Sequence, residues 1–271
     1  MKRFDGKNIV ITGGSAGIGL EVARQFAYEG ARVVLVARRS GPLEEAALEL
    51  RSFGADVLTI AADVAVQSEC DAVIAKTVKQ LGALDGLVNN AALHHRGPFN
   101  SNSAAELAHM VQVNLSAPIY LSRVAFPHLV ATRGFIVNVS SIAGCVPTPG
   151  SAVYSATKFG LRALSLALAE EVKDSGVRVT VVSPGPVDTG FIMDHLDGVT
   201  DLTMSQPIST ASQVATAILA CAEDGQFERK LPMQSGLLAT FAYLVPSVAR
   251  LIRPALERKG RRIRQKLLKN R

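Results

Sequence analysis

The chain has no tryptophan, and Phe, Tyr and Trp together make up only 5% of its residues. So few aromatics do not favour a surface that stacks nucleic-acid bases. Cysteine is scarce as well: Cys70, Cys145 and Cys221 follow neither a disulfide nor a metal-ligand spacing. This usage predicts reduced, buried thiols in a reducing compartment. For Cys145, which lies near Ser141, a reactive role stays open beside a packing role.

Long apolar runs and a secretory leader are also missing. No apolar stretch reaches the ~18 residues expected of a membrane-spanning helix, and residues 1–7 lead directly into the first expected strand. Charged residues make up 19% of the chain, which is a globular rather than a disordered composition. We therefore expect a folded cytoplasmic protein, whose 271 residues are enough for one large core.

The net charge of +6 comes from the end of the chain. Residues 250–271 hold ten Lys or Arg side chains and one acid, Glu257, a local balance of +9 that leaves −3 for residues 1–249. The body is therefore slightly acidic, and the basicity belongs to the tail.

Runs of Val and Ile alternate with helical patterns along the first 225 residues. Apolar runs without polar alternation predict strands buried on both faces, as in a parallel sheet. We expect strands at residues 8–12, 32–36, 57–61, 86–89, 135–139 and 177–182. Helices are expected at residues 20–29, 42–53, 68–81, 104–130 and 154–174.

This order predicts an α/β fold, a single Rossmann-type domain over residues 1–235 in which a doubly wound parallel sheet carries helices on both faces. Residues 190–209, rich in Asp, Thr, Ser, Gly and Pro, predict a mobile loop near the site. Residues 236–271 predict a C-terminal helical extension that is first apolar and then basic.

A glycine-rich stretch, Thr12-Gly13-Gly14-Ser15-Ala16-Gly17-Ile18-Gly19, separates the first expected strand from the first expected helix. Glycines at such a junction let the backbone turn tightly and approach a pyrophosphate, which then lies on the helix N-terminus. An ordinary turn is the alternative, and the flanking strand and helix favour a dinucleotide site.

Tyr154 and Lys158 are four residues apart, so a helix places them on one face. An ammonium beside a phenol favours the phenolate and brings its pKa from ~10 toward neutrality, where a phenol exchanges protons readily. Ser141, thirteen residues before Tyr154, adds a hydroxyl for a substrate oxygen. A Tyr four residues before a Lys is common in helices. The pair therefore indicates a catalytic site only in combination with the glycine stretch.

With these motifs the chain resembles the short-chain dehydrogenase/reductase family over about residues 5–225. The resemblance rests on blocks in the family's order: Thr12 to Gly19, Asp63-Val64, Asn89-Asn90-Ala91-Ala92, Asn114, Ser141, Tyr154 with Lys158, and Pro184-Gly185-Pro186-Val187-Asp188-Thr189. It implies a reversible hydride transfer between a nicotinamide cofactor and a small-molecule carbonyl/alcohol pair.

The resemblance implies four catalytic residues. Tyr154 is expected to give its proton to the developing alkoxide, and Ser141 to hydrogen-bond the same oxygen. Lys158 is expected to lower the pKa of Tyr154 and to hold the nicotinamide ribose. Asn114 lies in the helix expected at residues 104–130, where an Asn needs partners; its counterpart in the family anchors a water of a proton relay.

Other positions match the family's cofactor contacts. Asp63 and Val64 resemble the contact to the adenine edge, and Thr189 resembles the residue that steadies the nicotinamide carboxamide. The expected cofactor-binding residues are Thr12, Gly13, Ser15, Gly17, Ile18, Gly19, Arg38, Asp63, Val64, Asn90, Ala91, Tyr154, Lys158, Pro184, Gly185, Val187 and Thr189.

Arg38 decides the expected cofactor. Ala37 stands where NAD-binding members of the family carry an acid. An acid hydrogen-bonds the ribose 2′-hydroxyl of NAD and repels a 2′-phosphate, whereas an arginine pairs with that phosphate. We therefore expect NADP(H), with Ser15 adding a hydrogen bond, and hence reduction as the physiological direction. The alternative is that Arg38 and Arg39 are solvated on an exposed loop.

The substrate pocket is less defined by the sequence. His94-His95 follows the fourth expected strand, but no Cys, His or carboxylate stands at ligand spacing, so we expect a polar loop or a substrate contact and no metal. Few charges near the site suggest a lipophilic ketone. Candidate walls, with core packing as the alternative, are Phe99, Val146, Phe191, Ile192 and Met193.

The tail leaves three interpretations open. Residues 237–245 are mostly apolar, stop at Pro246 and precede the basic run, which predicts an interfacial segment on an anionic membrane. A structural tail that packs on the catalytic body and closes the substrate cleft, or that forms a dimer interface, is equally favoured. Nucleic-acid binding is disfavoured because the body is acidic. The rival function is a membrane- or nucleic-acid-associated binding protein with the dinucleotide fold as scaffold or sensor.

The resemblance to the family also leads to an expectation about oligomer formation. Many family members end in a strand and a glycine pair that contribute to a tetramer interface. The sequence shows no such ending, so we expect a homodimer formed through two long helices, including residues 154–174.

Overall fold

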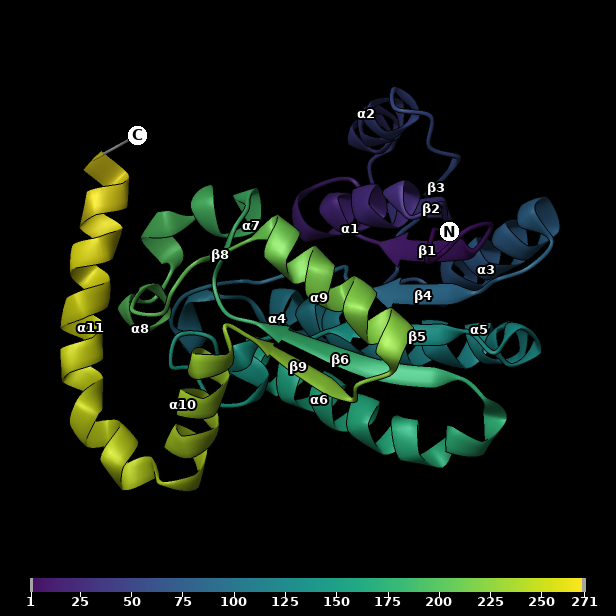
Figure 1. The fold of residues 1–271 in the computed structure, drawn as a ribbon. Helices are drawn as coiled ribbons and strands as arrows, with labels where there is room; N and C mark the ends of the chain where they lie inside the picture. The colour runs from purple at the N-terminus through teal and green to yellow at the C-terminus, as the bar shows by residue number, and fades with distance from the viewer. Residues whose placement is uncertain (1, 270–271) are drawn as a thin grey trace.

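The computed structural model of the chain describes residues 2–269 (Figure 1). Seven strands form one parallel sheet in the order β3-β2-β1-β4-β5-β6-β9. They are β1 (Asn8–Thr12), β2 (Arg32–Ala37), β3 (Val57–Ala61), β4 (Gly86–Asn89), β5 (Phe135–Val139), β6 (Arg178–Pro184) and β9 (Glu228–Leu231). The strand order changes direction between β1 and β4, and such a switch point opens a crevice at the carboxyl ends of the strands.

Helices cover both faces of the sheet (Figure 1). On one face lie α1 (Gly17–Tyr28), α2 (Ser40–Arg51) and α9 (Ala211–Asp224). On the other lie α3 (Gln67–Leu81), α5 (Ala117–Thr132) and α6 (Ala152–Glu171). Ile9 and Ile11 of β1 are buried in the first layer and Val10 in the second, because successive strand side chains point to opposite faces. The predicted doubly wound α/β fold is confirmed.

The sheet contains one strand more than the six expected from the sequence. β9 pairs in parallel with β6 at the edge of the sheet, from Val181 with Glu228 to Pro184 with Leu231. Its sequence, Glu-Arg-Lys-Leu, does not look apolar because it is an edge strand, whose charged side chains reach partners such as Arg162. No glycine pair follows this strand in the sequence, so the expectation of a dimer stays a prediction.

The helix expected at residues 104–130 is also different. It is divided into α4 (Ala104–Val111), a π-helical turn (Gln112–Ser116) and α5. A π turn inserts an extra residue and frequently lies at a functional site. Asn114 lies in this turn, and its side chain is fully buried.

The loop expected at residues 190–209 holds two short helices, α7 (Gly190–Met193) and α8 (Asp201–Met204). The pair β7 (Val187–Asp188) and β8 (Ser209–Thr210) closes its base. Inside the loop, Leu196, Val199 and Met204 are buried together. This segment is therefore packed, with a small apolar cluster of its own.

The C-terminal extension forms α10 (Met233–Leu244) and α11 (Pro246–Lys269), drawn in yellow in Figure 1. α11 packs on α8: Arg261 and Arg264 reach Asp201 at 3.2 and 2.9 Å. Ile263 and Leu267 pack on the apolar cluster of the loop. Within residues 2–269 no helix has both the length and the apolar character needed to span a membrane. Residues 270 and 271 of the predicted tail lie outside the described residues.

Candidate active site

The glycine stretch forms a tight turn between β1 and α1. Gly13 and Gly17 have φ angles of +67° and +54°, which L side chains rarely adopt. A Cβ on Gly19 would lie 2.1 Å from the carbonyl oxygen of Gly13. Ala16 caps α1 without a side-chain hydrogen bond, so the first-turn N–H groups lack a side-chain acceptor from the N-cap and suit a phosphate.

Thr12 and Asn90 join the two loops of the switch point. The Thr12 hydroxyl accepts hydrogen bonds from the backbone N–H groups of Asn90 and Ala91, both at 3.0 Å. The Asn90 amide donates to the Thr12 carbonyl at 2.9 Å. Both loops are thereby held at fixed positions beside the crevice.

Two adjoining cavities lie along this edge of the sheet. The larger, about 810 Å³, extends from the glycine turn past Ser141 and Tyr154 to α10 and α11. The smaller, about 230 Å³, includes Ser15 and Arg38 in its lining. Gly13 and Ala91 line both cavities. Together they form one elongated site of the kind that a dinucleotide and a substrate share.

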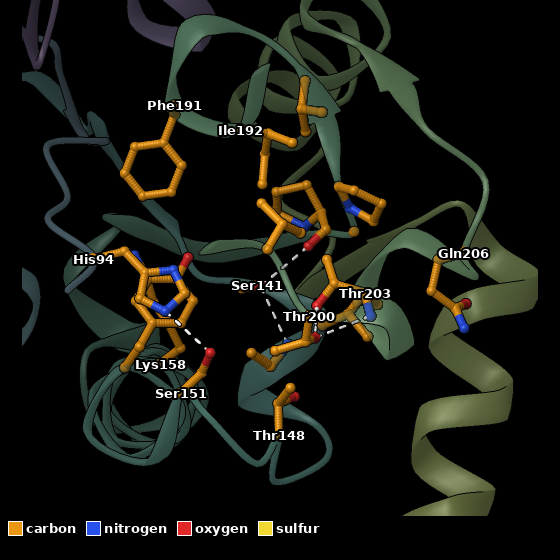
Figure 2. Close-up of a pocket in the computed structure, with 18 of the residues that line it drawn as sticks. His94, Ser141, Thr148, Ser151, Lys158, Phe191, Ile192, Thr200, Thr203 and Gln206 are labelled. Carbon is orange, nitrogen blue, oxygen red and sulfur yellow. Dashed lines mark hydrogen bonds between the residues drawn. The ribbon is translucent and has the colours of Figure 1, made fainter. Parts of the chain in front are cut away.

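Ser141, Tyr154 and Lys158 line the larger cavity, where Figure 2 labels Ser141 and Lys158. Ser141 follows β5 and caps a short 3-10 turn, while Tyr154 and Lys158 lie one turn apart on α6. The Lys158 ammonium donates to the Val139 carbonyl at 2.9 Å and lies 5.7 Å from the centre of the Tyr154 ring. The side chains of the predicted trio therefore meet at one point.

The pKa values of this trio are set mainly by burial. Burial raises the pKa of Tyr154 above its ordinary value, against lowering by a Ser141 hydrogen bond and by the charge of Arg96. Burial lowers the pKa of Lys158 to about 8. The expectation that Lys158 brings the Tyr154 pKa toward neutrality is not met in this structure, where desolvation dominates and the phenol keeps its proton.

Residues 7–198 match the family model described as short chain dehydrogenase. The chain belongs to the short-chain dehydrogenase/reductase family. It is therefore an oxidoreductase of alcohol/carbonyl chemistry that uses a nicotinamide dinucleotide and a small-molecule substrate, in a family whose members are commonly oligomeric.

Three relatives illustrate the range of the family. The 2,5-dichloro-2,5-cyclohexadiene-1,4-diol dehydrogenase LinX of Sphingobium indicum is 39% identical over 69% of this chain and 75% of its own length. The ketoacyl reductase HetN of a Nostoc species is 34% identical over 80% of this chain and 77% of its own. An 11-beta-hydroxysteroid dehydrogenase of Pinus massoniana is 31% identical over 90% of this chain and 72% of its own.

Two solved structures share the fold. A short-chain dehydrogenase/reductase of Caenorhabditis elegans, solved with cofactor, has a TM-score of 0.74 at 30% identity. The match covers 86% of this chain and 99% of that one. Levodione reductase has a TM-score of 0.78 at 23% identity, covering 86% of this chain and 98% of its own.

Most of the predicted cofactor residues of this short-chain dehydrogenase/reductase line the two cavities. Thr12 and Gly19 lie behind the lining, the first in the hydrogen bonds to Asn90 and Ala91 and the second packed on Gly13. In the larger cavity are Gly13, Gly17, Ile18, Asn90, Ala91, Tyr154, Lys158, Pro184, Gly185, Val187 and Thr189, and in the smaller are Gly13, Ser15, Arg38, Asp63, Val64 and Ala91.

Asn114 lies behind the cavity rather than on its wall. Its carbonyl oxygen accepts from the Leu93 N–H at 2.7 Å, and its amide donates to the Leu93 carbonyl at 2.8 Å and to Thr157 at 3.3 Å. The expected partners of the side chain are thus found. The assignment of Asn114 to a proton relay stays a prediction.

His94 and Arg96 are cavity residues whose roles the sequence did not define. The His94 ring stacks on Tyr154 with centres 3.9 Å apart, and its Nε2 lies 3.1 Å from the Ser151 hydroxyl. Burial lowers the pKa of His94 to about 3, so the ring is neutral. Arg96 donates to the Phe191 carbonyl at 2.8 Å. A short loop segment carries no periodic signal that would have predicted these contacts.

The five residues expected to line the substrate pocket fall into two groups. Val146, Phe191 and Ile192 line the larger cavity. Phe99 is instead mostly exposed, and Met193 packs with the apolar cluster of the loop. No three His, Cys, Asp or Glu side chains gather as a metal site in residues 2–269.

The extension supplies a wall of the larger cavity, as one of the three interpretations of the tail predicts. Leu238 and Ala242 of α10 and Ala249, Ile252 and Leu256 of α11 line the larger cavity. Within each helix these positions recur at spacings of three or four residues. This helical periodicity was the sequence signal for an inward-facing apolar side.

Proposed function

We propose that the protein reduces a lipophilic ketone to a secondary alcohol with NADPH, and that Tyr154 is the general acid. The observation that carries this proposal is the convergence of Ser141, Tyr154 and Lys158 on the cavity that the glycine turn also lines. When bound, the reduced nicotinamide supplies the hydride that adds to the carbonyl carbon. The residues of the chain bind and orient the ketone and protonate its oxygen.

The proton is expected to come from the Tyr154 phenol. The raised pKa of this group favours the protonated form at neutral pH, which is the form that reduction requires. Ser141 offers a second hydroxyl to the same oxygen and stabilises the charge that develops there. Lys158, held by the Val139 carbonyl, is placed to bind the ribose of the cofactor.

The preference for NADP(H) is argued from the end of β2. Arg38 and Arg39 follow Ala37 and are exposed, and Arg38 lines the smaller cavity with Ser15. A guanidinium at this position attracts a 2′-phosphate, and no acid follows β2 to repel it.

A lipophilic substrate is argued from the rest of the wall. Phe191 and Ile192 lie on one side of the pocket, with the hydroxyl-bearing Thr148, Thr200 and Thr203 opposite them (Figure 2). The inner faces of α10 and α11 add mainly apolar side chains, with Arg250 and Arg253 among them. Such a wall suits an extended apolar molecule with few polar groups.

The direct test is NADPH oxidation with ketones graded in chain length and polarity, with NADH as the matched control cofactor. We expect turnover that rises with apolar length and that is faster with NADPH than with NADH. Equal rates with the two cofactors would reject the NADP(H) preference, and no turnover of any ketone would reject the proposed reaction.

We also propose a homodimer formed through α5 and α6. Ile119 of α5 is 45% exposed. α6 presents exposed small residues at helical spacing, Ala152, Ala156, Ala163 and Ala167, that let a second helix approach closely.

Peripheral binding of residues 237–271 to an anionic membrane surface is part of the same proposal. Its support is the basic balance of the tail and the exposed apolar side chains of α10.

A further inference from the structure

An exposed apolar surface covers the outer side of the extension. Met233, Leu237, Phe241 and Leu244 recur at spacings of four, four and three residues, which places them on one face of α10. Val248 and Leu251 continue this surface onto α11. We call these six residues the C-terminal apolar patch.

The exposure of the patch is unusual for this molecule. Among residues 2–269, four of the five most exposed large apolar side chains belong to it: Leu251 (80%), Met233 (72%), Leu244 (71%) and Leu237 (65%). The opposite side of α10 is packed, with Ala239 against Ile142 and Cys145. A contiguous apolar surface on a folded helix marks a binding face.

The same two helices form the outer wall of the larger cavity. Pro246, at the corner between α10 and α11, lines the cavity, while Leu244 and Val248 on either side of it are exposed. Ser141 and Tyr154 line the same cavity. The corner therefore lies between the patch and the cavity that holds the reaction site.

Basic side chains flank the patch along α11. Arg250, Arg258, Lys259, Arg262 and Lys266 are exposed, and Glu257 is the sole acid of the helix. An apolar face beside a row of cations complements the boundary between acyl chains and anionic headgroups. The slightly acidic body would be repelled by the same headgroups, which favours docking through the extension.

We propose that the C-terminal apolar patch docks on an anionic bilayer, and that the corner at Pro246 is the entrance through which a membrane-dissolved ketone reaches Tyr154. This inference rests on the proposed ketone reduction. The substrate then passes from one apolar phase to another, from the acyl chains to the cavity wall of α10 and α11. Its apolar surface need not be exposed to water on the way.

The test compares two double variants of the full chain. Leu244→Ser with Leu251→Ser alters the patch, and Leu48→Ser with Val66→Ser alters two exposed apolar positions elsewhere. Each protein is assayed for co-sedimentation with phosphatidylcholine vesicles, with and without phosphatidylserine, at low salt. Each is also assayed with NADPH for a short water-soluble ketone and for a long-chain ketone dissolved in the phosphatidylserine vesicles.

We expect the patch variant to keep the soluble-ketone rate but to bind the vesicles and turn over the vesicle-borne ketone at least about tenfold less well, because two apolar side chains no longer enter the lipid. The control variant should match the original protein in every assay. Vesicle binding should require phosphatidylserine and weaken as salt is added.

Several outcomes would overturn the inference. One is failure of the original protein to bind the vesicles, and another is an unchanged vesicle-ketone rate in the patch variant. If the original protein does not bind vesicles and the patch variant loses self-association in light scattering, the patch is a subunit interface. Vesicle binding without turnover of either ketone would leave the docking intact and reject the proposed reaction instead.

Discussion

Tyr154 has a different neighbour on each side, and together they define its chemistry. The His94 ring stacks on it at 3.9 Å, and Lys158 lies behind it. Because His94 is neutral, the stack adds no charge to the ring, whereas the charge of Arg96 lowers the pKa of the phenol. The arrangement orients the hydroxyl toward Ser141 while burial keeps its proton in place.

Replacing Tyr154 by Phe should leave the fold and the cofactor affinity unchanged and lower turnover by about 10²–10⁴-fold, because only the proton donor is removed. The measurement is kcat for ketone reduction, with cofactor binding followed by fluorescence as the control. Turnover near that of the original protein would contradict the assignment of Tyr154.

Lys158 gives a prediction for the pH dependence of stability. Its pKa is about 8 in the fold, below the ordinary value of 10.5 for a lysine, so between these pH values the unfolded chain binds more protons than the folded one. Stability therefore rises with pH across this window, whereas burying the charged ammonium costs stability below pH 8.

Replacing Lys158 by Met removes this titration. The free energy of unfolding of the original protein, relative to that of the variant, should increase from pH 8 to pH 10 in denaturant titrations. A difference that does not change with pH would show that Lys158 is not buried with a lowered pKa.

Arg38→Asp should weaken NADP(H) binding far more than NAD(H) binding, since attraction to a 2′-phosphate becomes repulsion. Arg51→Asp, on the far end of α2, provides a matched change of charge as the control. The measurement is the dissociation constant of each cofactor for the original protein and for both variants. An equal loss of both affinities would mean that Arg38 does not contact the phosphate.

At the scale of elements, the sequence predicted what is local and missed what depends on distant partners. β1, β3, β4 and β5 lie where their apolar runs predict. β9 was missed because an edge strand needs no apolar run, and the π turn was missed because it serves the contacts of Asn114 with Leu93 and Thr157. The packing of α11 depends on Asp201, sixty residues from Arg261, so no local pattern could reveal it.

The contact between α11 and α8 gives the prediction for this scale. A Cβ on Gly260 would lie 1.7 Å from the Asp201 carbonyl oxygen, so Gly260→Val should separate the two helices. We expect faster proteolysis within residues 190–209 and a higher KM for long ketones, with α1 to α6 unaffected. Lys259→Val, at the exposed neighbouring position, is the control. Unchanged proteolysis would show that the contact does not hold the loop.

At the scale of the whole molecule, the catalytic body and the extension are joined by the cavity. The body provides the glycine turn and the proton donor, and the extension provides the outer wall. The sequence predicted the parts of the site that the family shares. It left open whether the tail closes the pocket or binds a membrane, because cavity walls are apolar like any packed helix face.

The proposed dimer gives the prediction for this scale. Ala163→Arg places a large cation on the exposed face of α6, where it should prevent close approach of a second helix. Light scattering should change from the mass of a dimer to that of a monomer. Leu48→Arg, on α2, is the control. An unchanged mass would exclude α6 from the subunit interface.

The ion pairs between Asp201 and α11 also affect how fast the loop at residues 190–209 opens. A loop that is attached to nothing opens and closes on its own within nanoseconds to microseconds. Here the loop carries α8, and α8 is held by Arg261 and Arg264, so release of a product is expected to wait for the last helix of the chain to move. The residence time of the product should then shorten as salt weakens these pairs, which makes turnover a function of ionic strength.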